Sequence, residues 1–473
     1  MSAPLLIASN RGPVSFEEDD SGALVQRRGG GGLVSGVAGA SEAARAQWVC
    51  AALSAADRRA VRQGRVPAGV TLLDLDPVTF DQAYNRVANA TLWFIAHLLF
   101  DTATAPSFDA RTAREWEAYR SYGAAFAAAL AADAAPGAAV LVQDYHLALT
   151  PRQLRELRPD LRIGHFSHTP WAPPEYFALL PDDLAREVLL GMLGADAVGF
   201  HSARWADAFT RCCVQVLGAH HADGVIHHEG RSTRIGVHPL GVNPHELRAR
   251  AAEPDVQGRL PHLRELVGDC QLLLRVDRTE LSKNIVRGLE AYRELLRSRP
   301  QWRRRVVHLA FAYPSRHDLP EYRAYTGEVQ RVAREVNEQF AEAGWLPVHL
   351  EVRDDYPRSL AAYTLADVLL VNPLRDGMNL VAKEGPVLSG RGVSLVLSRQ
   401  AGAADELGAH AHLVNPFDVA ETARALHEAL STPAPLRAER SARLAAAATA
   451  LPPTAWLAAQ LAALPPYAPA SRP

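Results

Sequence analysis

Short runs of consecutive apolar residues alternate along the first half of the chain with longer stretches in which apolar positions have helical spacing. The apolar runs cover residues 5–8, 139–142, 162–166 and 197–200. The helical stretches between them include residues 111–130 and 152–157. Continuous apolar runs of this length predict strands that are buried on both faces, and the repeated strand–helix–strand order predicts a parallel sheet covered by helices.

The same pattern restarts in the second half of the chain. Its apolar runs cover residues 271–276, 306–311, 348–352, 368–371 and 394–397. The sequence therefore predicts an α/β protein with two doubly wound, Rossmann-like domains that face each other across a cleft. The turn-rich residues 240–244 mark the expected junction. The expected division is 1–240 for an acceptor-binding domain, 241–450 for a nucleotide-sugar-binding domain, and 451–473 for a C-terminal helix and frayed tail.

Composition narrows the classes of function. The 473 residues are 48% hydrophobic and 22% charged, as in an ordinary soluble globular protein, and the net charge is −2. Neither nucleic acid nor an anionic membrane is an expected partner, so an anionic substrate must be held by locally placed Arg and Lys. The four cysteines lack metal-ligand spacing, and the adjacent Cys212 and Cys213 are expected to be buried thiols. Without a signal-like start or an apolar run of about 20 residues, the predicted location is cytoplasmic.

The most informative segment is 374–384, directly after the apolar run 368–371. Asp376 is expected at the carboxyl end of a strand, where open α/β sheets bind ligands. Asn379 and the following Leu380 and Val381 are expected to open a helix whose free N–H groups and dipole favour a diphosphate. Glu384, one turn further on, is within reach of a ribose. The alternative interpretation is an ordinary strand–turn–helix corner.

Two cations, Arg278 and Lys283, lie in the predicted loop after the strand at 271–276. Cleavage of a sugar–diphosphate bond develops negative charge on the leaving phosphate, and fixed cations stabilise that charge. Arginine binds two phosphate oxygens in a fork, whereas lysine supplies a point charge. The alternative is a solvated basic loop.

Two strands of the first half end in side chains suited to binding a sugar. Asp144 follows the apolar run 139–142 and is expected to orient acceptor hydroxyls. His168 follows the run 162–166, precedes a Pro-rich loop, and is expected to donate to the donor sugar. A structural histidine is the alternative for His168, and it is the preferred interpretation for His146 and His165.

Further candidates surround these positions. Arg11 follows the first strand, and the glycine run 29–32, which includes Gly32, predicts either a loop that closes over a ligand or simply a flexible connection. Tyr84 and Trp93 are expected on one helix near a sugar, although ordinary core aromatics are the alternative. Arg316 follows the strand at 306–311 and is expected to clamp a phosphate. No Gly-Lys-Ser/Thr or Gly-x-Gly-x-x-Gly motif is present, which argues against a P-loop and a nicotinamide cofactor.

These residues resemble, in order and spacing, the trehalose-6-phosphate synthases of glycosyltransferase family 20, particularly actinobacterial members, which have the GT-B fold. The resemblance runs from Leu5 to about Phe417. It rests on Ser9-Asn10-Arg11, Gly31-Gly32-Leu33, Tyr84-Asn85 with Trp93, Asp144 to Leu147, His168-Thr169-Pro170, Asp277-Arg278 with Ser282-Lys283, and residues 373–384.

The resemblance implies a role for each matched position. The donor diphosphate would be held by Arg278, Lys283 and the backbone of Asn379, Leu380 and Val381, and the ribose by Glu384. The donor glucose would contact Gly32, His168 and Asp376. Glucose 6-phosphate would contact Arg11, Tyr84, Trp93, Asp144 and Arg316.

The resemblance further implies a retaining transfer of glucose from GDP-glucose or UDP-glucose to glucose 6-phosphate. It implies no cofactor and no metal ion, because cations take the metal's place, and it leaves a homo-oligomer open. One departure concerns residues 47–54, where many members have a Gly-Trp-Ser/Thr-Gly segment and this chain has only Trp48. Alternatives are therefore a member with another acceptor, such as a glucosylglycerol-phosphate synthase or a cyclitol-joining pseudo-glycosyltransferase, and a catalytically silent regulatory subunit.

Overall fold

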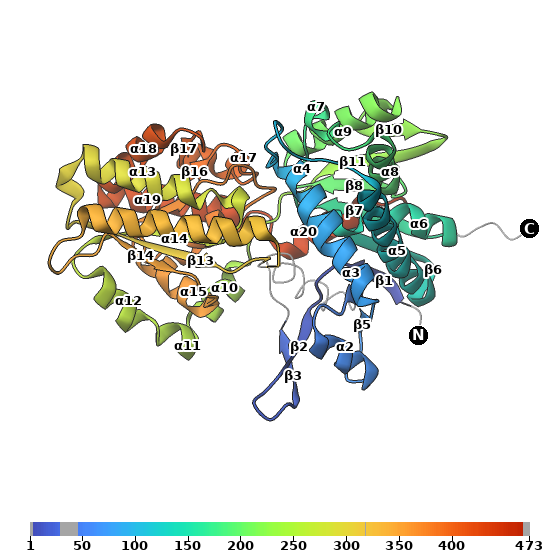
Figure 1. Ribbon diagram of the computed structural model, residues 1–473, viewed down its shortest axis with the longest axis horizontal. Helices are drawn as coiled ribbons and strands as arrows, with labels where there is room; N and C mark the ends of the chain where they lie inside the picture. Colours follow the sequence, from blue (N-terminus) through green and yellow to red (C-terminus); the bar gives the residue numbers. More distant parts are fainter. Residues whose placement is uncertain (1–2, 29–45, 317, 467–473) are drawn as a thin grey trace, which may run out of the picture. The chain divides into compact units, whose positions relative to one another are not determined.

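The computed structural model describes residues 3–28, 46–316 and 318–466, drawn as ribbons in Figure 1. Its contacts divide the chain into two compact units. Unit 1 comprises Met1–Leu240 and Pro453–Pro473, and unit 2 comprises Gly241–Pro452. The chain thus enters unit 2 once and returns to unit 1 for its last helix. The acceptor and donor roles expected for the two domains stay predictions.

Unit 1 is built on a nine-stranded sheet with the order β5-β4-β1-β6-β7-β8-β11-β10-β9. The strands are β1 (Ala3–Ala8), β4 (Gln47–Ala51), β5 (Val70–Leu73), β6 (Ala134–Gln143), β7 (Arg162–Ser167), β8 (Ala197–Phe200), β9 (His220–Ala222), β10 (Val225–His228) and β11 (Arg231–Val237). From β5 to β11 all pairings are parallel, whereas β10 pairs antiparallel with both β11 and β9. The expectation of a purely parallel sheet is therefore wrong at this edge.

The helices of unit 1 lie along this sheet, and a separate hairpin pairs β2 (Val14–Glu18) with β3 (Leu24–Arg28) (Figure 1). The helices are α2 (Ala55–Arg62), α3 (Pro77–Asp81), η1 (Gln82–Leu92), α4 (Trp93–His97), α5 (Ala110–Asp133), η2 (Tyr145–Leu147), α6 (Thr150–Leu157), α7 (Pro174–Phe177), α8 (Asp182–Met192), α9 (Ala203–Leu217) and α20 (Pro453–Ala463). The last of these, α20, packs on β7, β8 and β11.

Unit 2 contains a six-stranded, entirely parallel sheet with the order β14-β13-β12-β15-β16-β17. The strands are β12 (Gln271–Arg278), β13 (Val306–Tyr313), β14 (Val348–Glu351), β15 (Val368–Val371), β16 (Ser394–Ser398) and β17 (His412–Val414). The connecting elements are α10 (Pro244–Ala251), α11 (Pro254–Gln257), α12 (Leu260–Val267), η3 (Leu281–Lys283), α13 (Ile285–Ser298), η4 (Pro300–Trp302), α14 (Pro320–Phe340), α15 (Tyr356–Leu365), α16 (Val381–Leu388), α17 (Ala404–Leu407), η5 (Gly408–His410), α18 (Val419–Ser431) and α19 (Ala434–Thr449).

The predicted strands are confirmed because their apolar runs are the buried centre of each sheet. Every residue of β15 is buried, as is every residue of β8 and β16. Covering both faces of a parallel sheet removes the alternation of polar and apolar residues that marks a half-exposed strand. Cys212 and Cys213 are likewise buried as free thiols in α9, as predicted.

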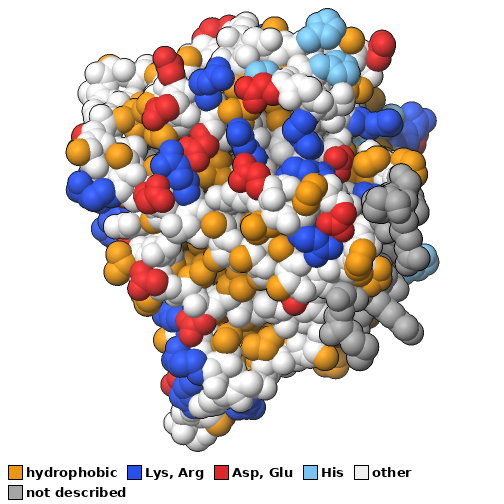
Figure 2. Space-filling view, turned by 90° about the vertical axis from the view of Figure 1, so that its right-hand side faces the viewer, with side chains coloured by type: hydrophobic (Ala, Val, Ile, Leu, Met, Phe, Trp, Pro, Cys, Tyr) orange, Lys and Arg blue, Asp and Glu red, His pale blue; other side chains and the backbone are white. Residues whose placement is uncertain are grey.

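Surface charge agrees with the near-neutral composition. On the face of unit 1 in Figure 2, positive and negative side chains are interspersed, and histidines gather at one end. Among the described residues, no helix combines the length and apolar character that crossing a bilayer requires.

Candidate active site

The predicted site residues of unit 2 follow three neighbouring strands. Arg278 is the last residue of β12 and Lys283 follows that strand, Arg316 comes after β13, and Asp376 comes after β15, with β12 between the other two strands in the sheet. Because neighbouring parallel strands end at the same edge, their loops meet there. The backbone connects two of these loops directly, since the Leu374 N–H donates to the Ser282 carbonyl at 2.8 Å.

Lys283 and Asp376 form the centre of this group. The Nζ atom of Lys283 lies 2.6 Å from Asp376 Oδ2, and the Asn379 side chain donates to the same oxygen at 3.1 Å. Burial favours the neutral amine, but Asp376, Asp277 and Glu280 raise the pKa of Lys283 above its ordinary value. The lysine therefore stays protonated and offers a fixed positive charge.

A buried carboxylate that the sequence reasoning missed lies between the cations. Glu280 has no exposed surface, and its Oε1 accepts from Ser315 Oγ at 2.8 Å and lies 3.2 Å from Arg278 Nε. Burial favours the neutral acid, but Arg278, Arg316 and Lys283 lower the pKa of Glu280 to about 2. Arg316 also donates to the Tyr322 hydroxyl at 2.6 Å.

The helix α16 begins at Val381, two residues later than the sequence predicts. Asn379 has a φ of 86°, which ends any helical path, and its Oδ1 accepts from the Ala382 N–H at 3.1 Å. The N–H groups of Leu380 and Val381 donate no hydrogen bond to the residues that the structure describes. Two donors at the positive end of the helix are thus open to an anion.

Glu384 lies in the first turn of α16 and faces Tyr363, whose hydroxyl is 3.4 Å from Glu384 Oε2. Burial raises the pKa of Glu384 to about 7. A half-buried carboxylate with one distant partner retains acceptor capacity, as a ligand of two neighbouring hydroxyls requires. This position agrees with the predicted ribose contact, which stays a prediction.

A second buried ion pair lies on β12, just before the loop that carries Lys283, and stabilises it. Arg275 and Asp277 on β12 are joined at 2.7 Å, and neither side chain is more than 5% exposed. Arg275 also donates to the Lys283 carbonyl at 3.1 Å and to the Asn372 side chain. Burial raises the pKa of Asp277 to about 6 despite the nearby Arg275. This pair fixes the backbone that carries Lys283.

Lysine is rare in this protein, and both of its lysines lie in unit 2, in the segments that contain the predicted site residues. Of the 50 Lys and Arg residues, Lys283 and Lys383 are the only lysines. Lys383, in α16, is fully buried and pairs with Glu406 at 2.5 Å, whereas 14% of the Lys283 side chain is exposed. Elsewhere every cation is an arginine, so only Lys283 presents an ammonium group beside the predicted diphosphate position.

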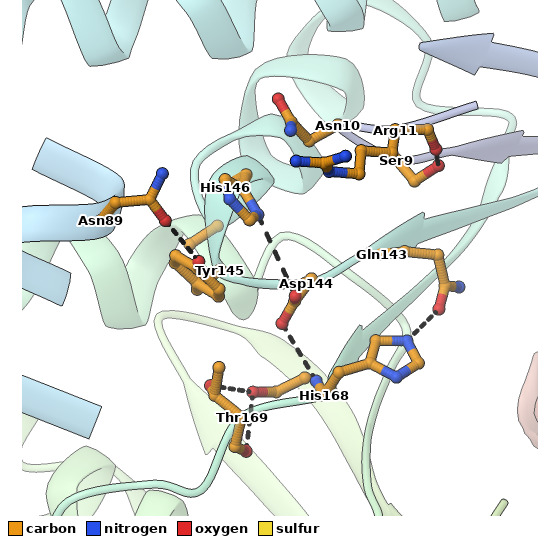
Figure 3. A network of polar contacts seen from close by, with 12 residues as sticks. Ser9, Asn10, Arg11, Asn89, Gln143, Asp144, Tyr145, His146, His168 and Thr169 are labelled. Atoms are coloured by element: carbon orange, nitrogen blue, oxygen red, sulfur yellow. Dashed lines mark hydrogen bonds and ion pairs between the residues drawn. The ribbon is translucent and has the colours of Figure 1, made fainter. Parts of the chain in front are cut away.

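In unit 1 the predicted residues again follow neighbouring strands. Arg11 comes after β1, Asp144 after β6 and His168 after β7, and these three strands are consecutive in the sheet. Figure 3 shows the contacts: Asp144 Oδ1 accepts from the His168 backbone N–H at 3.1 Å, and Asp144 Oδ2 lies 4.0 Å from His146 Nδ1. The sheet thus brings Asp144 and His168 together.

Backbone strain marks three of the predicted residues. Asp144, with a φ of 73° and a ψ of 167°, lies in a region that essentially only glycine adopts. Arg316 and Asn379 also have positive φ, at 47° and 86°. Such conformations cost on the order of 1–3 kcal/mol each and concentrate at functional sites. The strain directs these side chains, and it supports their selection as site residues.

His168 is more constrained than predicted. Its Nε2 lies 2.9 Å from Gln143 Oε1, and its Nδ1 lies 3.1 Å from His201 Nε2 (Figure 3 shows the first contact). Burial and the neighbouring His201 and His165 lower the pKa of His168 well below its ordinary value, so the ring is neutral. Because both ring nitrogens of His168 are hydrogen-bonded within unit 1, His168 can donate to a sugar only if one of these hydrogen bonds is replaced by one to the sugar.

The remaining unit 1 candidates differ in exposure. Tyr84 on η1 is partly exposed and stacks on His146 with ring centroids 5.4 Å apart. Trp93, in contrast, is 7% exposed and stacks on His97 at 3.8 Å, as a core aromatic does. Arg11 is exposed, and its carbonyl accepts from Ser9 Oγ at 2.6 Å.

Trp48, the tryptophan of the altered segment 47–54, is a core side chain. It is buried in β4, and its Nε1 donates to Ser9 Oγ at 2.7 Å. It therefore supports the turn that carries Arg11. His165 is fully buried, and burial lowers its pKa to about 3. Gly32 and the rest of the glycine run lie outside the described residues.

Sequence reasoning also missed Gln143, His201, Ser315 and Trp456. His201 follows β8, so the rule that strand ends carry ligands signals it. Ser315 precedes Arg316 and could be found in the same way. Trp456, on α20, lies 5.7 Å from the His168 ring and donates to the His238 carbonyl at 3.0 Å. No local signal links α20 to His168, because the segments are far apart in sequence.

Comparison with known proteins agrees with this arrangement. The family model for glycosyltransferase family 20 matches residues 4–465. A bifunctional trehalose-6-phosphate synthase/phosphatase from Thermoproteus tenax is 38% identical over 351 residues, which are 74% of this chain and 47% of that protein. The chain spans about half of the length of the first curated relatives that it matches.

Two solved structures have the same fold throughout. An α,α-trehalose-phosphate synthase (UDP-forming) from Burkholderia vietnamiensis aligns with a TM-score of 0.84 at 30% identity, over 97% of this chain and 99% of that one. A Burkholderia xenovorans enzyme of the same name, in complex with glucose-6-phosphate, gives 0.85 at 28% identity, over 97% and 99%. The two Rossmann-like units are thus those of a GT-B fold. On the extent of these matches, the chain belongs to glycosyltransferase family 20.

Proposed function

We propose that the protein transfers glucose from a nucleoside diphosphate glucose to glucose 6-phosphate, with retention of anomeric configuration, to form α,α-trehalose 6-phosphate. The observation that carries the proposal is the cation group of unit 2 beside the open N–H groups of α16. Its donor is UDP-glucose or GDP-glucose. Relatives whose names include (UDP-forming) favour UDP-glucose. The loop Thr279-Glu280-Leu281 favours GDP-glucose, because it resembles the loop of actinobacterial family members, some of which prefer that donor.

Unit 2 has the chemistry that a diphosphate leaving group needs. Arg278 and Lys283 supply positive charge, and Leu380 and Val381 supply N–H donors at a helix start. These groups stabilise the charge that develops as the sugar–phosphate bond breaks. In this proposal the leaving phosphate itself takes the acceptor proton during front-face attack, so a glycosidase-type carboxylate pair is not required.

Unit 1 supports the acceptor half of the proposal. Asp144 is held in a strained turn, and Tyr84 and His146 form a stacked surface next to it. A carboxylate accepts hydrogen bonds from sugar hydroxyls, and aromatic rings cover the apolar faces of sugars. The Burkholderia xenovorans relative was solved in complex with glucose-6-phosphate, which supports the same acceptor here.

The proposal is tested by incubating the purified protein with UDP-, GDP- or ADP-glucose and with glucose 6-phosphate, glucose or glycerol 3-phosphate. Product identity and anomeric configuration are read by NMR. The expected result is α,α-trehalose 6-phosphate from glucose 6-phosphate. A preference for glycerol 3-phosphate or glucose would replace the acceptor assignment, and the absence of transfer from every donor would overturn the proposal.

Donor binding should depend on pH through Glu384. Its pKa of about 7 is above the ordinary value, so at neutral pH about half of the folded molecules keep this proton, which they must release to accept two ribose hydroxyls. The groups facing it are the hydroxyls of Tyr363 and Tyr313. Donor affinity should thus rise with pH, by about tenfold from pH 6 to pH 8 as the ionised fraction increases.

Calorimetric titration with the nucleotide sugar measures this dependence, because its diphosphate diester has no titration in this range. Glu384→Gln should bind more weakly and show a flat profile between pH 6 and pH 8. An equal slope in Glu384→Gln and in the unmodified protein would remove Glu384 as its source.

Arg316 should determine the preference for a phosphorylated acceptor. Arg316→Ala removes a cation whose guanidinium can fork a phosphate, and charge-assisted bonds contribute about 1.5–3 kcal/mol. The kcat/KM for glucose 6-phosphate should fall about 10- to 100-fold, mainly through KM, while that for glucose changes little. Arg331→Ala, which removes an exposed arginine of α14, is the matched control. An unchanged ratio of the two efficiencies would contradict the assignment.

A further inference from the structure

Glu280 is held in place by its backbone as well as by its side chain. It lies between the end of β12 and η3, in a loop that is bonded to the end of β13. The Thr279 N–H donates to the Tyr313 carbonyl at 2.6 Å, and the Lys283 N–H donates to the Glu280 carbonyl at 2.9 Å. The position of the carboxylate is therefore fixed relative to both loops.

The carboxylate joins groups from these two loops. Ser315 and Arg316 belong to the loop after β13, whereas Arg278 is the last residue of β12 and Lys283 is the last residue of η3, which follows it. Glu280 Oε1 contacts Ser315 Oγ and Arg278 Nε, whereas Oε2 is buried without a hydrogen-bond partner among the described residues. A buried charge is costly unless it is compensated, and here three cations compensate one carboxylate.

The Arg278 contact leaves the binding end of that side chain open. Glu280 is paired with Nε, and the terminal amino groups of Arg278 make no hydrogen bond to the described part of the chain. About half of the side chain is exposed. Holding a guanidinium by Nε directs its two terminal nitrogens away from the anchor, which is the arrangement that a forked phosphate contact uses.

We propose that Glu280 is a positioning residue that holds Arg278 through its Nε and, through Ser315, the loop that carries Arg316, so that the cations for the two phosphorylated substrates are set together. This inference rests on the proposed function. Glu280 touches neither substrate, and it acts through the two arginines. Glu280 is also an anion beside the predicted phosphate positions, so its charge weakens binding of the diphosphate in the ground state. At the same time it orders the cations that the transfer step needs.

The two effects of Glu280 predict that its neutralisation lowers turnover without weakening the binding of a nucleoside diphosphate. Glu280→Gln keeps the size of the side chain but removes the charge. Turnover should fall about 10- to 100-fold, as expected when a group is misplaced by about 1 Å. Binding of the nucleoside diphosphate should not weaken, because a competing negative charge has been removed. Glu280→Asp restores the charge and should recover most of the turnover.

The matched control is Asp367→Asn, which neutralises another buried carboxylate of unit 2. Asp367 pairs with Arg437 at 3.2 Å and accepts from the Leu272 N–H at 2.9 Å, at the amino-terminal edge of the sheet. Asp367→Asn should lower the melting temperature, but it should not lower turnover while leaving diphosphate binding unchanged. The measurements are kcat with glucose 6-phosphate, calorimetric binding of UDP and GDP, and thermal unfolding, on the full chain.

Each outcome decides the inference. Low turnover with undiminished diphosphate binding in Glu280→Gln, rescued by Glu280→Asp, supports it. Parallel loss of turnover and binding, or no rescue by aspartate, assigns Glu280 to stability alone. Full turnover in Glu280→Gln in a protein that transfers glucose overturns only this inference. If the unmodified protein neither binds UDP or GDP nor transfers glucose, the proposed function fails and this inference fails with it.

Discussion

Lys283→Ala should lower turnover on the order of 100-fold or more, because removing one preorganised charge contact to a transition state costs about 2.7–4 kcal/mol. Lys283 is held protonated by Asp376 at 2.6 Å, so the substitution removes a full charge and also releases a partly buried carboxylate. The loss should therefore appear in kcat, measured as release of the nucleoside diphosphate at saturating donor and acceptor.

Two further variants make this result specific. Lys283→Arg keeps a cation and should recover part of the activity, although the planar guanidinium does not reproduce the compact ammonium group. Arg297→Ala removes an exposed cation of α13 that pairs with Glu294, and turnover should be unchanged. Near-normal turnover in Lys283→Ala would exclude Lys283 from charge stabilisation.

Arg275→Met should destabilise unit 2 by about 3–5 kcal/mol, the usual cost of leaving one member of a buried ion pair without its partner. Asp277, 7% exposed, would lose its contact at 2.7 Å. The loss should depend on pH, because the pKa of Asp277 is about 6 in the folded protein, above its ordinary value. Folding stability from such a group is present at low pH and is lost as the pH rises through about 6.

The measurement is the free energy of unfolding from urea denaturation at pH 5 and pH 8. The destabilisation by Arg275→Met should be larger at pH 8, because the attraction that the variant loses exists only when Asp277 is ionised. The double variant Arg275→Met with Asp277→Asn should recover stability, since replacing both partners removes the buried charge. Equal losses at both pH values, or no recovery in the double variant, would show that the ion pair does not determine the effect.

Sequence reasoning recovered the two parallel cores because their strands are continuous apolar runs. It missed the antiparallel edge formed by β9 and β10, whose exposed strands are rich in histidine and lack such a run. Edge strands are short and polar for a physical reason, since an apolar edge invites pairing with other chains. The polarity that protects the edge also hides it from a search for buried strands.

The site could be predicted from strand ends, because Arg278, Lys283, Asp376 and Arg316 lie at or shortly after the carboxyl ends of strands of one sheet. The rule does not reach residues whose importance depends on burial. Glu280 lies in an ordinary loop by sequence, and its contact with Ser315 spans 35 positions. Likewise, the bond from His168 to His201 closes only when β7 and β8 pair. Positive φ at Asn379 also shifted the helix start, which residue preferences alone do not reveal.

The scarcity of lysine gives this protein an unusual chemical surface. Its only two side-chain amines are Lys283 and the fully buried Lys383. Acylating esters and amine-directed cross-linkers, which attach to many places on most proteins, have a single partly accessible side-chain target here. Modification of Lys283 by such a reagent therefore reports directly on whether its ammonium group is covered, and attachment of a dye or a solid support through side-chain amines would act on the same group that the proposed reaction requires.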